Sequence, residues 1–311
     1  MLAVQKHQSC YNMSSTTDAL IQPVVANTIN AVMCAMFSFG MIMTPQKFMT
    51  GGRANAPWFH PDAIPEERDN RLYYIAQFMG LLMVGSAVVP TLYDPDTQML
   101  TYQFAIINGL QFLHGLVFLT TDIYATARPA TCASIMQWVG MTIMGGAAFA
   151  VSAIASAHAT PDVADPTSTV VSKYGANIAM CAFSSFFGLM FLAPKYILSS
   201  FWQDEGAQGG DDMCGFRILD LSHIETFWAR NIGLTILGLN IGYGVDAVVA
   251  HPVYTVGSLT TVTLLTLHNL HQVAMRPYRS ISDYQLYVSW IPNIILSLAM
   301  AAVLACAVIH A

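Results

Sequence analysis

The stretch NAVMCA (residues 30–35) returns later in the chain as NIAMCA (residues 177–182). Both copies lie inside an apolar run that ends in a proline, Pro45 in the first copy and Pro194 in the second, and a lysine follows soon after each proline. A repeated stretch in a repeated setting indicates a duplicated structural unit, and such repeats decide the fold more than any single element does.

The correspondence continues along the rest of the chain at a nearly constant offset, and we call two matched residues repeat mates. The mates beyond the first stretch are Ala76 and Ala229, Gly80 and Gly233, Leu81 and Leu234, Gly85 and Gly238, His114 and His268, Tyr124 and Tyr278, and Trp138 and Trp290. The sequence therefore predicts a polar N-terminal tail (1–19), a first repeat (20–159), a linker (160–170) and a second repeat (171–311).

The composition is typical of an integral membrane protein. The chain has 311 residues, of which 55% are hydrophobic and 10% charged, and its mean hydropathy is +0.51. Soluble domains carry about a quarter charged residues, so this chain has too few charges to cover a globule in water. The tail lacks the basic and apolar regions of a signal peptide.

Eight apolar runs are long enough to cross a bilayer as helices, which takes about 20 residues. The predicted spans are 20–43, 71–93, 101–121, 131–157, 171–193, 227–250, 252–275 and 284–309. Strands are not expected because the runs lack alternation of period two. Pro90 and Pro292 lie inside runs, so we expect kinks in the second and eighth spans.

Lysine and arginine gather on one side of the predicted membrane. Ten of them lie in or beside the loops after spans one, three, five and seven, and two, Lys6 and Lys173, lie on the other side. Positive loops stay on the cytoplasmic side, so both termini are expected on the opposite, non-cytosolic side. Which membrane holds the protein is left open.

Each predicted repeat has four spans, so the second repeat enters the membrane in the same orientation as the first. The expected fold is an all-α membrane protein of eight transmembrane helices, arranged as two tandem parallel four-helix repeats. A pseudo-twofold axis along the membrane normal would relate them. Gly80 and Gly233 each follow an alanine at the small-xxx-small spacing that lets helices approach closely.

Polar side chains inside two spans are the best candidates for a site. Asn108, Gln111 and His114 form a stripe on the third span, and His268 and His271 belong to a stripe on the seventh, with Asn269 beside them. Two interpretations stay open. The histidines are ligands of a metal, a haem or a tetrapyrrole pigment, or part of a polar path, or they are neutral and bond neighbouring helices together.

One acid, Asp246, lies well inside a predicted span. It is interpreted either as an ion or proton site near His251 or as an interfacial residue at a helix end. Arg230 is expected to reach the interface or to pair with Glu225. The six cysteines form no Cys-x-x-Cys pair, so neither a disulfide framework nor a metal site is predicted.

Motifs for catalysis and nucleotide binding are missing from the sequence, and a net charge of −6 without a basic patch argues against nucleic acid. Three functions remain. The first is a non-catalytic scaffold or an accessory subunit, with membrane lipid and other membrane subunits as partners. The second is a small-solute transporter or channel, and the third is a haem- or pigment-binding protein using the paired histidines.

Overall fold

The structure, a computed structural model, describes most of the chain. It covers residues 21–50, 57–64, 71–128, 131–159, 162, 169–202, 212–213, 216–217, 220–249, 251–275 and 281–309, with the backbone alone for 212–213, 216–217 and 242–249. The polar tail, Tyr278 and the last two residues of the chain therefore lie outside the described residues.

The described residues are almost entirely helical. The helices of the first half are α1 (Pro23–Met43), α2 (Pro45–Met49), η1 (Pro61–Ala63), α3 (Arg71–Met83), η2 (Val84–Val88), α4 (Val89–Tyr93), α5 (Gln98–Thr120), η3 (Asp122–Ala127) and α6 (Cys132–His158). Those of the second half are α7 (Lys173–Leu192), α8 (Pro194–Phe201), α9 (His223–Val249), α10 (Pro252–Ala274), α11 (Asp283–Gln285), η5 (Leu286–Trp290) and α12 (Ile291–Val308). Two short antiparallel strands, β1 (Asp212–Met213) and β2 (Phe216–Arg217), lie between α8 and α9.

Six helices within the described residues are long and apolar enough to cross a membrane: Pro23–Met43, Arg71–Tyr93, Gln98–Thr120, Cys132–His158, Lys173–Leu192 and Asp283–Val308. Each matches a predicted span to within a few residues. The predicted spans 227–250 and 252–275 also form long helices, α9 and α10, but are not among these six. Five threonines, two histidines, an asparagine and a glutamine lower the hydropathy of α10, and the last side chains of α9 lie outside the described residues.

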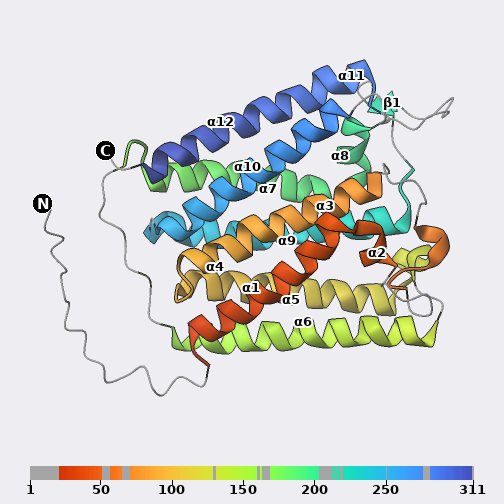
Figure 1. The fold of residues 1–311 in the computed structure, drawn as a ribbon, viewed down its shortest axis with the longest axis horizontal. Coiled ribbons are helices and arrows are strands. Elements are labelled where there is room, and N and C mark those ends of the chain that lie inside the picture. The colour runs from red at the N-terminus through yellow and green to blue at the C-terminus, as the bar shows by residue number, and fades with distance from the viewer. Residues whose placement is uncertain are drawn as a thin grey trace, which may run out of the picture.

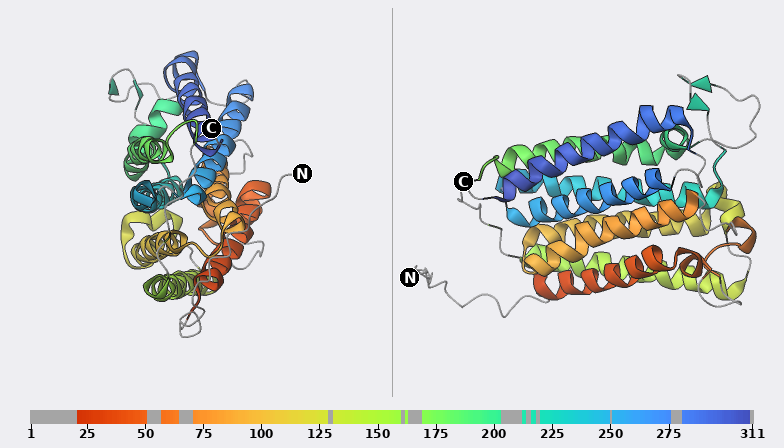
Figure 2. Two further views of the ribbon diagram at one scale, coloured as in Figure 1. Left: turned by 90° about the vertical axis from the view of Figure 1, so that its left-hand side faces the viewer. Right: turned by 45° about the horizontal axis from the view of Figure 1, so that its top comes forward.

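The long helices lie side by side in one slab (Figures 1 and 2). The start of α1 and the end of α12 are at one end of this slab, and α2, α8 and the strands are at the other (Figure 1). At the centre, α9 packs on α3 and α5, and α10 packs on the continuous helix α3–η2–α4. Helices α6 and α12 lie toward opposite edges (Figure 1).

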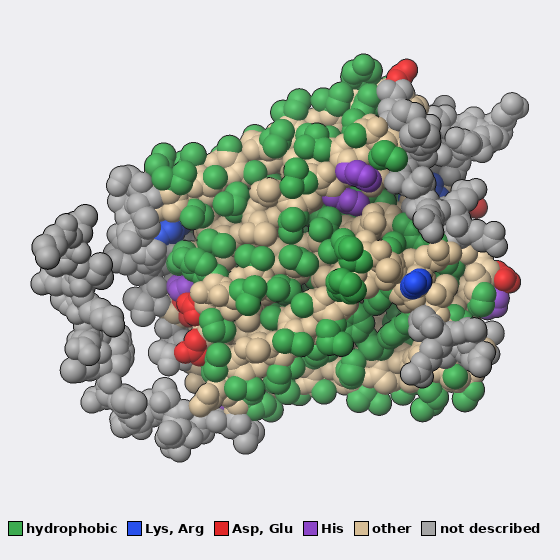
Figure 3. All heavy atoms as spheres, in the orientation of Figure 1, with side chains coloured by type: hydrophobic (Ala, Val, Ile, Leu, Met, Phe, Trp, Pro, Cys, Tyr) green, Lys and Arg blue, Asp and Glu red, His purple; other side chains and the backbone are tan. Residues whose placement is uncertain are grey.

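The outer faces of the long helices are apolar, and side chains such as Met36, Phe39 and Phe186 are exposed there. Figure 3 shows hydrophobic side chains along the length of one face and the described charges near its two ends. Exposed apolar area on this scale is unfavourable in water and favourable in lipid. The chain is therefore compatible with a multi-pass integral membrane protein.

Each half begins with the same local turn. Helices α1 and α7 end at Thr44 and Ala193, whose backbone angles are similar (φ −142°, ψ 57° and φ −112°, ψ 63°). Pro45 and Pro194 then start the short helices α2 and α8 at the first helical position, where proline lacks no needed N–H. The two prolines thus turn the chain sharply at the same place in each half.

The prolines inside the spans do not simply break their helices. A π-helical turn precedes each of them, η2 before Pro90 and η5 before Pro292. Because proline cannot donate a backbone bond and clashes with the preceding turn, one wider turn absorbs the misfit and the helix continues. Pro90 lies on the second span and Pro292 on the eighth, so the two wide turns are not repeat mates.

Asp162 caps α5 from a distant part of the chain. One oxygen of its carboxylate accepts the backbone N–H of Gln98 and the other accepts that of Met99, both at 3.0 Å. Replacing Asp162 with alanine leaves two N–H groups at the positive end of the helix without an acceptor, so we expect a loss of about 1 kcal/mol in stability. Asp162→Asn should lose less, and thermal unfolding in detergent would measure both. Equal melting temperatures for Asp162→Ala and the parent would contradict the capping role.

Candidate functional site

The two candidate histidines occupy matching surroundings at the centre of the slab. The ring of His114 on α5 stacks on Phe227 of α9 with centroids 4.7 Å apart and planes at 14°. The ring of His268 on α10 stacks on Tyr74 of α3 with centroids 4.7 Å apart and planes at 12°. Tyr74 precedes Gly80 by the same spacing as Phe227 precedes Gly233, so these aromatic residues are repeat mates as well. Each histidine therefore packs on the other half of the chain.

Both ring nitrogens of His114 form hydrogen bonds. Nδ1 lies 3.0 Å from Oδ1 of Asn231 on α9, and Nε2 lies 2.8 Å from the hydroxyl of Tyr124. Arg230 donates from Nη1 to the same hydroxyl at 3.2 Å. An amide oxygen only accepts, so we assign the proton to Nδ1, and Tyr124 then donates to Nε2. For a neutral ring, this pattern of hydrogen bonds joins α5 to α9 and to η3.

The rest of the predicted stripe on α5 also bonds to other helices. Asn108 donates to Oδ1 of Asn30 at 2.6 Å, and Asn30 donates to Oγ of Ser152 at 2.9 Å. Gln111 donates to Oγ1 of Thr235 at 2.9 Å. The stripe thus ties α5 to α1, α6 and α9.

The residues of the stripe predicted on the seventh span lie in different surroundings. His268 is half-buried, whereas His271 is exposed and does not join it in the interior. Asn269 takes the interior position instead; its Oδ1 accepts the hydroxyl of Tyr74 at 2.7 Å, and its Nδ2 donates to Asn293 at 3.2 Å. From the sequence, Asn269 was expected only beside the stripe. Polar residues lie on several sides of α10, so the packing of neighbouring helices decides which side is buried.

The expected partner of Arg230 is wrong. Glu225 pairs with Arg71 at 2.6 Å, an ion pair between the first turns of α9 and α3, with side chains that are 6% and 17% exposed. Arg230 bonds instead to the carbonyl of Leu192 and to Tyr124. Arg71 was not a candidate because its partner lies in the other half of the sequence.

The side chain of Asp246 lies outside the described residues, so its assignment stays a prediction. Near it in the chain, Nε2 of His251 is 3.9 Å from the carboxylate of Asp94. Desolvation raises the pKa of Asp96 in the same loop, and the carboxylates of Asp94 and Asp162 add to the shift. Among the described residues no group of three or more His, Cys, Asp or Glu side chains could hold a metal ion.

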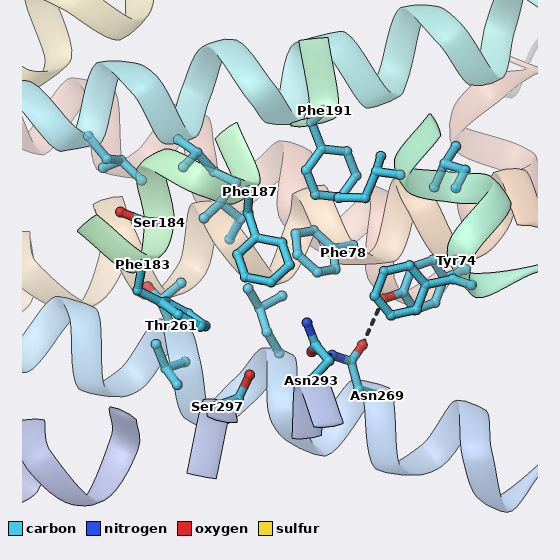
Figure 4. Close-up of a pocket in the computed structure, with 18 of the residues that line it drawn as sticks. Tyr74, Phe78, Phe183, Ser184, Phe187, Phe191, Thr261, Asn269, Asn293 and Ser297 are labelled. Atoms are coloured by element: carbon cyan, nitrogen blue, oxygen red, sulfur yellow. Dashed lines mark hydrogen bonds between the residues drawn. The ribbon is translucent and has the colours of Figure 1, made fainter. Parts of the chain in front are cut away.

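Two cavities flank the central helices, one in each half. The first-half cavity has a volume of about 180 Å³ and is lined from α1, α5 and α6, with Phe227, Trp228 and Asn231 contributed by α9. The second-half cavity has a volume of about 90 Å³ and is lined from α7, α10 and α12, with Tyr74 contributed by α3. Figure 4 shows the second-half cavity, with Phe183 and Phe187 pointing into it and Tyr74 bonded to Asn269.

An indole forms a matching hydrogen bond in each half of the chain. Nε1 of Trp138 donates to the carbonyl of Trp58, and Nε1 of its repeat mate Trp290 donates to the carbonyl of Phe201 at 2.7 Å. Both acceptors belong to the segment that follows the first long helix of that half. These segments are therefore fixed to the bundle by hydrogen bonds from α6 and η5.

Comparison of the chain with protein-family models, with curated proteins and with solved structures finds no match.

Substituting His114 separates a bonding role from a ligand role. In His114→Gln the amide can still bond across the helices, so we expect a loss of about 1 kcal/mol or less, since interhelical bonds average about 0.6 kcal/mol. His114→Phe keeps the stacking on Phe227 but leaves Asn231 without its donor, and should cost about 1–3 kcal/mol. Thermal unfolding of the two purified variants measures the difference. A visible absorption band in the parent that disappears in His114→Gln or His268→Gln would instead favour haem or a pigment.

Proposed function

We propose that this protein is a non-catalytic membrane scaffold, built from eight transmembrane helices as two tandem parallel four-helix repeats. The first repeat takes residues 20–159 and the second residues 171–311. The paired central crossings carry the proposal. An alanine methyl at Gly85 would meet Thr261 of α10, and one at Gly238 would meet Ile107 of α5. Gly85 is the repeat mate of Gly238, and Thr261 is the repeat mate of Ile107, so the two crossings correspond to each other.

The use of polar groups inside the bundle supports a scaffold. Asn30, Asn108, Gln111 and His114 each bond to a helix other than their own. Buried polar side chains that bond across helices hold a membrane bundle together. These polar groups therefore bond to other helices of the bundle. The apolar outer faces are available to contact lipid and partner subunits.

The predicted sidedness of the repeats is tested by cysteine labelling. Cys10 and Cys214 should react from opposite sides of a sealed vesicle, because the positive loops are expected on the cytosolic side and the termini on the other. A membrane-impermeant maleimide applied before and after permeabilisation measures this in single-cysteine variants. Labelling of both cysteines from the same side would overturn the eight-span assignment.

The scaffold role is tested by mild-detergent purification from the native membrane. We expect partner membrane subunits at fixed stoichiometry, and loss of those partners when exposed residues such as Phe39 or Phe186 are replaced by alanine. Recovery of the parent protein alone would contradict the proposal.

A small-solute transporter is the second candidate, and the paired cavities favour it. Parallel repeats with equivalent sites occur in transporters. Purified protein in liposomes should then accelerate the flux of a solute, and the acceleration should fall when either cavity is filled by a larger side chain. Flux equal to that of empty liposomes would count against a carrier.

A further inference from the structure

The two cavities differ in the polar groups that line them. In the first-half cavity, the indole nitrogen of Trp228 is buried and has no hydrogen-bond partner among the described residues, and the same is true of the hydroxyl of Thr142. Both side chains are 7% exposed. An indole N–H can only donate, and a buried donor without an acceptor is unfavourable. The lining therefore includes a buried donor for which the described residues supply no acceptor.

The other polar groups of this lining already have partners. Asn30, Asn108, Gln111 and His114 take part in the interhelical bonds described above. Among the described residues the remaining lining is mostly methionine and aromatic, with Met33, Met141, Met144 and Phe112 among its members, and it includes no Lys, Arg, Asp or Glu. An apolar wall with one open donor fits an uncharged molecule that carries an acceptor.

The second-half cavity does not have these groups. By the alignment of the halves, Ile75 follows Tyr74 where Trp228 follows Phe227, and Ile294 stands after Trp290 where Thr142 stands after Trp138. The second cavity also has half the volume, about 90 Å³ against about 180 Å³. The two halves therefore differ at the positions where a ligand would be held.

The first-half cavity lies close to the outer surface of the bundle at α6. Met144 of α6 lines it and is also 44% exposed. On the same helix, Gly145 lines the cavity, and a methyl added there would meet no atom closer than 3.9 Å. A molecule dissolved in the membrane would thus have a lateral way in beside α6.

We propose that the first-half cavity binds an uncharged, largely apolar molecule through a carbonyl-type oxygen that accepts the N–H of Trp228. The hydroxyl of Thr142 is a second polar group of this lining that has no partner among the described residues. Methionine and aromatic side chains cover its apolar body. This site adds to the scaffold function and does not depend on it.

Benzophenone and diphenylmethane test the site, because they have a similar shape and differ in the carbonyl. Benzophenone is equilibrated with the purified full-length protein and irradiated, and the modified residues are mapped by peptide mass spectrometry. Benzophenone reacts readily with methionine, so we expect labelling of Met33, Met141 or Met144. Excess diphenylmethane should compete poorly. If diphenylmethane competes as strongly as unlabelled benzophenone, the carbonyl contributes nothing to binding and the proposal is overturned.

Variants on α6 and α9 tie the labelling to the proposed contacts. Thr142→Val keeps the shape of the side chain and Trp228→Phe keeps an aromatic ring without the N–H, and each should weaken benzophenone binding by about five-fold. Gly145→Leu should abolish labelling by filling the cavity. Gly140→Leu is its control, because an added methyl at Gly140 meets nothing within 4 Å, and Ser297→Ala is a control in the second cavity. Unchanged affinity in both Trp228→Phe and Thr142→Val, or labelling that survives Gly145→Leu, would overturn the site. Thr142→Val decides the matter alone if Trp228→Phe does not fold.

Discussion

Gly85→Ala is expected to destabilise the protein by about 3 kcal/mol or more, although it adds a single methyl group. That methyl would lie 2.3 Å from Oγ1, 2.6 Å from Cα and 2.7 Å from N of Thr261. Two of these atoms belong to the backbone of α10, so a side-chain rotation cannot make room and the two helices must separate. Overpacking usually costs about 1–3 kcal/mol and more where the backbone has to move.

Alanine substitutions at three other glycines should destabilise the protein less than Gly85→Ala, each to a different extent. At Gly238 the nearest atom is Cγ1 of Ile107 at 2.7 Å, a flexible side chain, while the backbone stays at 3.4 Å. Gly238→Ala should therefore cost less than Gly85→Ala. At Gly233 the carbonyl of Gly188 lies at 2.8 Å, so Gly233→Ala should fall between them, and Gly140→Ala should be neutral. Melting temperatures from size-exclusion chromatography after heating would rank the four variants. A Gly85→Ala protein as stable as Gly140→Ala would disprove the close crossing.

Breaking the ion pair between the halves should have a similarly large effect. Arg71 contacts both oxygens of Glu225, with Nε at 2.6 Å and Nη2 at 3.4 Å. Glu225 also accepts from the backbone N–H and the hydroxyl of Ser222, which closes the first turn of α9. Arg71→Met would leave this buried carboxylate without its cation, and breaking a buried pair costs about 3–5 kcal/mol.

The double variant Arg71→Met/Glu225→Leu separates the charge from the packing. It removes both ions, so we expect it to recover most of the stability lost in the single variant. The pair between Arg128 and Asp122 is the surface control: Asp122 is 93% exposed, and Asp122→Ala should cost less than about 1 kcal/mol. Unfolding midpoints in denaturing detergent would measure the series. If the double variant is no more stable than Arg71→Met, the loss comes from packing and not from the unpaired charge.

Local features of the sequence predict most of the helices. Apolar runs of bilayer length and the prolines between them placed six candidate membrane spans to within a few residues. The repeated residues also marked His114 and His268 as a matched pair. Pro90 and Pro292 were expected to kink their helices, and each is preceded by a π-helical turn that lets the helix continue. The width of that turn depends on the packing around it and has no marker in the sequence.

The sequence by itself determined which segments are helical, where they turn and which residues correspond between the halves, because length, hydropathy and proline act locally. Only the tertiary structure decided which helices meet. Lipid tails are as apolar as the side chains of the helices, so burial of apolar surface does not favour one helix pair over another. Helices instead pair where small residues allow close approach and where a few polar side chains form hydrogen bonds. That choice paired Gly85 with Thr261, His114 with Phe227 and Arg71 with Glu225, each joining two distant parts of the chain. It also placed Trp228 at the cavity of the other half, where its N–H has no acceptor among the described residues.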